Sequence, residues 1–412
     1  MATYYVAKTG NDSNAGTDQT APKLTIASAI SAADTAEDII EIIDEGTYSE
    51  NNLTISVNDI TVRHTASSLG RPVVDSTGGT HFVQTYGEFL TLVGLEIKGG
   101  TSYTLKKGDA DYNKFHVSGC FIHETPKLGS HTLDNQDAER STIKQSVLYF
   151  DGTAVGISSE NGLEISNCLI TASAGTSQIM LGYSATTNTA SFSTFIHRGA
   201  SNTGLIVQAW SKVINCIVSG SGKGIGSDDH TYNLLEVSGE DFRNYADNSN
   251  GSAGTGDVID TDPLFLDGDA EGAAATVAGN YNLESSSPAI GAGITFDSIT
   301  VDISGTTRPQ DTTFDIGAFE VIPPYWADFS AEPQPHFSGD FVIQGYRNLA
   351  SNYRLKNISS IKQVPLSLGV KGPPSLRRAP QESLDEFTDI AGSTPYVNSD
   401  GGPALDLVEE TD

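Results

Sequence analysis

The sequence has 412 residues, 37% hydrophobic and 18% charged, and a formal net charge of −29. A chain with this net negative charge is repelled as a whole by phosphate backbones, so we expect no nucleic-acid partner. No segment approaches the roughly 18 apolar residues of a membrane-spanning helix, so we expect no membrane insertion.

Residues 1–50 are predicted to form an N-terminal cap. Apolar residues recur on one face between about Thr25 and Asp34, which predicts an amphipathic helix, and the apolar run Ile39–Ile43 predicts a strand. A helix here would cover the strand edges and the apolar core at the end of a repeat. The first residues lack the basic and apolar regions of a secretory leader, so we expect either that a leader has been removed or that the protein does not leave a cell by the secretory route.

Residues 51–240 carry a repeat that is marked by three cysteines. Cys120, Cys168 and Cys216 are 48 residues apart, and equivalent positions between and before them extend the series to 95, 120, 146, 168, 194 and 216. Apolar residues recur five and three positions before most of these positions and two after them. Short alternating segments with a period of about 24 residues predict a β-solenoid, in which these positions form one internal ladder.

The cysteines are predicted to be free thiols. Residues two coils apart in a solenoid are separated by roughly 10 Å, because adjacent parallel strands lie about 4.8 Å apart. A disulfide needs Cα atoms within about 7 Å of each other. We therefore expect small buried hydrophobes here, with a metal cluster or a redox pair as the alternative.

The period ends after residue 240. Residues 241–320 are rich in Asp, Gly and Ser and are predicted to form the last coils and a C-terminal cap, and residues 321–412 are predicted to be an extended, proline-rich arm. Within the arm, residues 343–380 carry seven basic residues and no acid, whereas residues 381–412 carry nine acids and no base. We expect the basic part to dock on a partner, through the following residues: Arg347, Arg354, Lys356, Lys362, Lys371, Arg377 and Arg378. The alternative is a tail that stays flexible or lies on the acidic solenoid.

Motifs at both ends of this region carry a family resemblance. Near the start they are Tyr4–Gly16, Pro22–Ile26 and Gly46–Tyr48; near the end they are Asp262–Phe265, Asn280–Leu283, Ser287–Gly293 and Arg308-Pro309 with Asp315–Glu320. In this order they resemble the ends of pectate-lyase-like proteins. The resemblance implies an all-β fold, a right-handed parallel β-helix, over about residues 3–320. That family includes polysaccharide lyases, surface proteins and phage virion proteins, so the fold leaves the function open.

We assign no catalytic site from the sequence. Lyases of the resembled family use a Lys or Arg as a base beside two or three acids. We find no basic residue of this sequence in register with such acids. Lys223 is the candidate base of such a lyase. Hydrolases of the resembled family use clustered aspartates with a His nearby, for which Asp228, Asp229 and His230 are the candidates. We favour the prediction that Asp228–His230 form a solvated turn between coils.

Two further features are weighed as ligand contacts. Residues 267–272 offer oxygen ligands for Ca²⁺ but lack the spacing of an EF-hand, so we favour an acidic turn and expect no cofactor, with Ca²⁺ as the alternative. His123-Glu124 and His197-Arg198 follow strands, and we expect both pairs to be outward and solvated, with sugar contact as the alternative.

These features favour a structural protein of a phage particle, of the tailspike, fibre or decoration type, located in the virion. Its partners would be other virion proteins or copies of itself, for example in a trimer, and host surface polysaccharide is a further candidate. The alternatives are a lyase or hydrolase of an acidic glycan and a non-catalytic glycan-binding surface protein.

Overall fold

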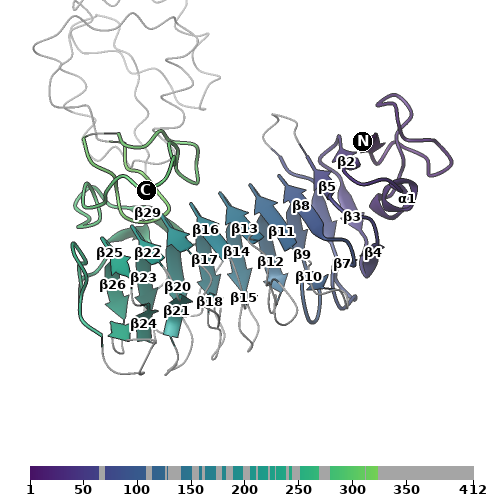
Figure 1. Ribbon diagram of the computed structural model, residues 1–412. Coiled ribbons are helices and arrows are strands. Elements are labelled where there is room, and N and C mark those ends of the chain that lie inside the picture. Colours follow the sequence, from purple (N-terminus) through teal and green to yellow (C-terminus); the bar gives the residue numbers. More distant parts are fainter. Residues whose placement is uncertain are drawn as a thin grey trace, which may run out of the picture. The chain divides into compact units, whose positions relative to one another are not determined.

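The computed structural model describes residues 1–64, 70–107, 114–125, 128, 141–150, 157–159, 163–172, 179–181, 189–197, 205–209, 212–220, 223–227, 229–237, 241–243, 251–268, 279–310 and 312–322. All of them lie in one compact unit, Met1–Pro323. The predicted basic arm residues lie outside the described residues. Stacked parallel sheets run through this unit and confirm the predicted parallel β-solenoid (Figure 1).

Two long sheets form adjacent sides of the solenoid. Sheet A contains, in spatial order, β1 (Thr3–Val6), β2 (Ile39–Ile42), β5 (Ile60–Arg63), β8 (Phe89–Val93), β11 (Lys114–Ser118), β13 (Ser141–Lys144), β16 (Leu163–Ser166), β19 (Thr189–Ser191), β22 (Lys212–Ile214) and β25 (His230–Thr231). Sheet B contains β3 (Thr47–Ser49), β6 (Val73–Asp75), β9 (Glu96–Lys98), β12 (Phe121–Thr125), β14 (Val147–Phe150), β17 (Leu169–Ala172), β20 (Thr194–His197), β23 (Ile217–Gly220) and β26 (Leu234–Val237).

Two shorter parallel sheets complete the coils in the described part of the chain. One joins β4 (Leu53–Ile55), β7 (Val83–Thr85) and β10 (Leu105–Lys107). The other joins β15 (Ile157–Ser159), β18 (Ile179–Leu181), β21 (Leu205–Ala209), β24 (Lys223–Gly226) and β27 (Phe242–Arg243). The sheets begin within residues 1–50, because β1, β2 and β3 already pair with later strands.

The predicted helix at the N-terminal end is α1 (Ile26–Ala32), which packs against β1, β2 and β4. Thr25 precedes the helix and accepts a hydrogen bond from the Ser28 N–H at 3.1 Å. The Glu50 carboxylate accepts from the N–H groups of Ile26 and Ala27 at 2.8 and 2.7 Å. These contacts satisfy backbone donors that the first turn of a helix leaves without an intrahelical partner.

The core is a set of inward ladders, because alternate residues of parallel strands stack from coil to coil. At the corner between sheets A and B the ladder includes Cys120, Ser146, Cys168 and Cys216, all buried. The cysteines are free, as predicted. The N–H of Cys120 donates to Ser146 Oγ at 3.2 Å in the next coil, and the N–H of Cys168 donates to Ser193 Oγ at 3.1 Å.

One position of the predicted ladder was wrong by a residue. Ser193, and not Thr194, stands in the ladder, since Leu169 pairs with Thr194. Phe195 therefore points into the core, where it pairs with Ile170. The residue that precedes the ladder position has a positive φ in successive coils, for example 52° at Asn167, 44° at Phe192 and 54° at Asn215. Asn tolerates this left-handed conformation better than most residues.

The chain after β27 leaves the coil pattern. Val258 bridges to Leu234 beside the last coil, and an antiparallel pair follows, β28 (Phe265–Asp267) with β29 (Asn280–Leu283). Residues 284–310 and 312–322, the C-terminal strap, then fold back over the outside of the corner between sheets A and B (green in Figure 1). Strands β17, β20 and β23 are consequently buried on both faces.

Candidate functional site

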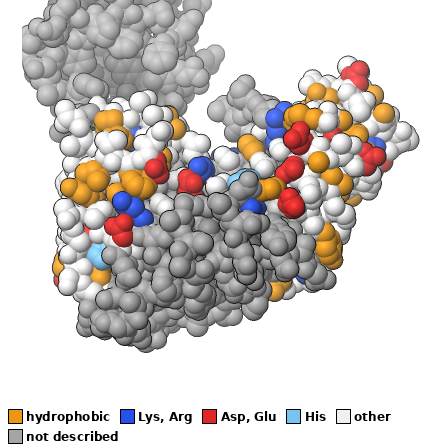
Figure 2. Space-filling model, in the orientation of Figure 1, with side chains coloured by type: hydrophobic (Ala, Val, Ile, Leu, Met, Phe, Trp, Pro, Cys, Tyr) orange, Lys and Arg blue, Asp and Glu red, His pale blue; other side chains and the backbone are white. Residues whose placement is uncertain are grey.

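The predicted catalytic candidates are divided between two sheets in the described residues. Lys223 starts β24 and pairs with Leu205 in a short sheet. Asp229 precedes β25, is 55% exposed and lies 3.9 Å from Lys212 Nζ. Asp228 lies outside the described residues. Figure 2 shows basic, acidic and histidine side chains near one another beside β22 and β25.

His230 has a structural position at the last coil. It pairs in register with Val213, a core residue, so it continues the inward row and is not part of a solvated turn. Its ring stacks on Phe242 with centroids 4.1 Å apart, and its Nδ1 lies 2.7 Å from Asp257 Oδ2. Asp257 also accepts from the N–H groups of Asn233 and Gly254 at 2.8 and 2.7 Å. His230 and Asp257 thus close the end of the core.

The two other histidines differ from the prediction that both are solvated. His197 is 1% exposed and lies in the inward row beside Ala172 and Gly220. The one-residue error at Thr194 explains this, because a shift by one residue exchanges the two faces of a strand. His123 does point outward but is only 7% exposed, because neighbouring side chains cover it. Arg198 lies outside the described residues.

His123 belongs to a polar and aromatic cluster on sheet B. Its Nε2 lies 3.0 Å from Glu96 Oε1, in the preceding coil, and its ring stacks on Phe121 with centroids 4.3 Å apart. Its Nδ1 lies 3.5 Å from Glu124 Oε1. Next to it, Lys98 Nζ lies 3.4 Å from Asp75 Oδ2.

This cluster occupies the part of the sheet B exterior that the strap leaves accessible. We define the open face as the outward side chains of β6, β9 and β12 and Tyr149 of β14, which are listed here: Val73, Asp75, Glu96, Lys98, Phe121, His123, Glu124 and Tyr149. Val147 of β14 packs instead with the cluster under the strap. Strand β14 alternates between partly exposed and buried residues, whereas β17 beside it is buried throughout. The open face therefore ends where the strap begins.

A lyase-type arrangement has one partial counterpart on sheet A. Lys144 Nζ lies 2.7 Å from Glu164 Oε1 in the next coil. This is a single acid and not the two or three that the resemblance implied. Among the described residues, no three His, Cys, Asp or Glu side chains group as metal ligands. Of the predicted acidic turn at residues 267–272, the structure describes Asp267 and Gly268 only.

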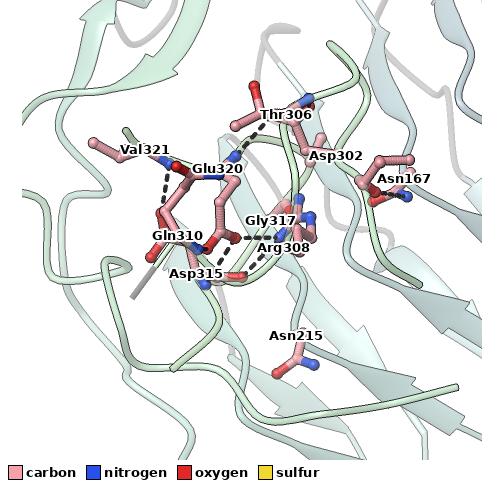
Figure 3. A network of polar contacts seen from close by, with 12 residues as sticks. Asn167, Asn215, Asp302, Thr306, Arg308, Gln310, Asp315, Gly317, Glu320 and Val321 are labelled. Carbon is pink, nitrogen blue, oxygen red and sulfur yellow. Dashed lines mark hydrogen bonds and ion pairs between the residues drawn. The ribbon is translucent and has the colours of Figure 1, made fainter. Parts of the chain in front are cut away.

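A fully buried ionic network lies inside the strap (Figure 3). Arg308 donates to Glu320 Oε2 at 3.1 Å and to the Gly317 carbonyl at 2.7 Å, and its guanidinium lies 4.8 Å from the Phe192 ring centroid. Asp302 accepts from the Glu320 N–H at 2.9 Å. Burial lowers the pKa of Arg308 and raises the pKa of Glu320. These residues hold the strap together, and the sequence indicated them only as an end motif.

The comparisons with known proteins concern the architecture. The crystal structure of pectate lyase Pel9A is 16% identical, with a TM-score of 0.42, over 78% of this chain and 96% of that chain. The crystal structure of a GH136 lacto-N-biosidase from Eubacterium ramulus is 11% identical, with a TM-score of 0.35, over 63% of this chain and 67% of that chain. No protein-family model and no curated protein matches the sequence. No helix in the described part of the chain is long and apolar enough to cross a membrane.

Proposed function

We propose that this chain is a structural protein of a phage particle whose solenoid contacts host-surface glycan without cleaving it. The observation that carries the non-catalytic part is the dispersal of the candidate groups. Lys223 lies in a short sheet, Asp229 is paired with Lys212 on the surface, and His230 closes the core against Asp257. A catalytic acid and base must both reach one substrate atom, whereas Lys223 lies on a different sheet from Asp229 and His230, and His230 is held by Asp257.

The shape of the solenoid supports a structural role. Both ends of the solenoid carry covered strand edges: Lys23 pairs with β1 at the end of sheet A, and Val258 pairs with β26 at the other end of sheet B. Covered edges prevent strand-to-strand aggregation, which a protein displayed in many copies must avoid. Stacked coils also create an extended outer surface that is available for binding.

The C-terminal arm is the proposed attachment element. Its segment 343–380 carries a charge of +7, whereas residues 1–342 carry 16 − 43 = −27. Opposite charges on one chain allow the segment to dock on a particle protein or on another copy of the chain. The test is to delete residues 323–412 and measure incorporation into particles. We expect the remaining solenoid to fold and to be absent from particles; normal incorporation of the truncated protein would refute the attachment role.

The second candidate function is a glycan lyase, and Lys144 beside Glu164 is the contact that favours it. It predicts that incubation with alginate, pectate or host capsule releases unsaturated ends and that Lys144→Ala abolishes the release. Arg63→Ala is the matched control, since Arg63 is also paired with an acid across a coil of sheet A, Glu41, but lies outside the open face.

A further inference from the structure

The strap divides the exterior of sheet B into a covered part and an open part. On the covered part, Leu169 and Ile196 pack with Tyr281, and Ile217 and Leu234 pack in a second cluster with Leu283. On the open part, the outward residues of β9, Glu96 and Lys98, remain partly exposed. A ligand on this side of the solenoid therefore meets the open face and not the later coils.

The open face carries two outward aromatic side chains on consecutive strands. Phe121 on β12 and Tyr149 on β14 are both partly exposed. The Phe121 ring is held by its stack on His123, and His123 is held by its contact with Glu96. Aromatic rings that are already fixed bind at a low entropic cost and stack on the apolar faces of sugar rings.

The charges on the described residues of the open face are mostly negative. Three carboxylates, Asp75, Glu96 and Glu124, have side chains that are 24%, 29% and 55% exposed. Among the described residues of the open face, one cation, Lys98, lies beside them and is paired with Asp75. Carboxylates accept hydrogen bonds from sugar hydroxyl and ammonium groups, whereas they repel the carboxylates of uronic acids.

We infer that the open face is the glycan-contact surface and that it takes neutral or amino-sugar glycans in preference to uronate-rich ones. The inference rests on the proposed function, because it assumes that the solenoid contacts glycan. It adds the location on β6 to β14, the anchoring rings Phe121 and Tyr149, and the charge class of the ligand.

The test measures binding of three hexasaccharide probes to the full chain by isothermal titration calorimetry at low salt. The probes are cellohexaose, which is neutral, a glucosamine hexamer, which is cationic, and hexagalacturonate, which is anionic. We expect the first two to bind at least about tenfold more tightly than the third. Raising the salt concentration should weaken the glucosamine hexamer most, because salt screens exposed charges.

Two substitutions test whether the glycan binds on the open face. Phe121→Ala and Tyr149→Ala should each weaken cellohexaose binding by about tenfold. Tyr86→Ala should leave binding unchanged; Tyr86 is 42% exposed and follows β7 in a different sheet. The folded state of each variant is checked by protection of the three buried thiols. If either open-face variant does not fold, the other one decides.

The outcomes separate the inference from the proposed function. Tightest binding of hexagalacturonate would overturn the charge class, and wild-type binding by both folded open-face variants would overturn the location. In either case glycan contact itself would stand. Failure of the wild-type chain to bind any of the three probes would contradict the proposed glycan contact as well.

Discussion

The side-chain amide of Asn215 forms two hydrogen bonds with the backbone of Ile294, which lies 79 positions later in the chain. Nδ2 donates to the Ile294 carbonyl at 2.7 Å, and Oδ1 accepts from the Ile294 N–H at 3.0 Å. Asn215 occupies the corner between sheets A and B with φ 54°. A corner residue of the solenoid thus fixes the strap directly.

Replacing Asn215 with Ala should lower the free energy of unfolding by about 2–3 kcal/mol. The change removes two buried hydrogen bonds at roughly 1 kcal/mol each and leaves the Ile294 groups without these partners. Urea unfolding measures the effect. Gln145→Ala is the control, because Gln145 has φ 48° at the equivalent corner of an earlier coil, so both variants place Ala in a left-handed conformation. Equal losses in the two variants would show that the strap contact adds nothing.

Replacing Ser193 with Ala should cost about 1–3 kcal/mol, because the buried Cys168 N–H loses its acceptor. Ser118→Ala is the matched control, since Ser118 points outward on β11. Both are measured by urea unfolding. A stability of Ser193→Ala equal to that of wild type would contradict the side-chain ladder at the corner.

The three thiols should not react with a thiol reagent in the folded protein at about pH 8. Burial raises the pKa of Cys120 to about 11 and the pKa of Cys168 and Cys216 to about 12, so little thiolate forms and none is accessible. Titration with an aromatic disulfide reagent should detect no thiol in buffer and three in urea. Rapid labelling in buffer would place a cysteine outside the core.

The strap should lose stability as pH rises from about 4 towards neutrality through the titration of Glu320. Burial raises the pKa of Glu320 above its ordinary value of about 4.3, so the folded state binds a proton more tightly than the unfolded state. The stabilisation is fully present below the unfolded pKa and is lost as pH rises through the folded pKa. Glu320→Gln cannot ionise, so its destabilisation relative to wild type should be largest near pH 4 and smaller near pH 7. A cost that grows with pH would reverse this assignment.

Much of the solenoid was predictable because its signals are local. Alternating apolar residues around Cys120, Cys168 and Cys216 gave the inward rows, and the 48-residue gaps gave the coil length. The same locality explains the errors. At Thr194 the template slipped by one residue, which placed His197 outside. At His230 the last coil is short, since Asn233 follows Cys216 by only 17 positions. The predicted period therefore did not place His230 in the inward row.

The strap was not predictable in this way. Its contacts join residues that are far apart in the sequence, such as Asn167 with Val301 and Asn215 with Ile294. Its backbone is irregular, so its sequence has no hydrophobic period from which a structure could be predicted. The open face is defined by where the strap ends, so Glu96, Phe121 and His123 could not be grouped as one surface from sequence. The single available signal was the outward apolar row at Leu169, Ile217 and Leu234, which a solvated sheet face does not favour.

The central claim is that the solenoid contacts glycan without cleaving it. The most direct measurement is the chain-length distribution of a bound polysaccharide after prolonged incubation with the full protein, read by size-exclusion chromatography. The account predicts that polysaccharide co-elutes with the protein and that its length distribution does not change. Shortened polysaccharide in the wild-type sample, with unchanged polysaccharide in a Lys144→Ala sample, would contradict it.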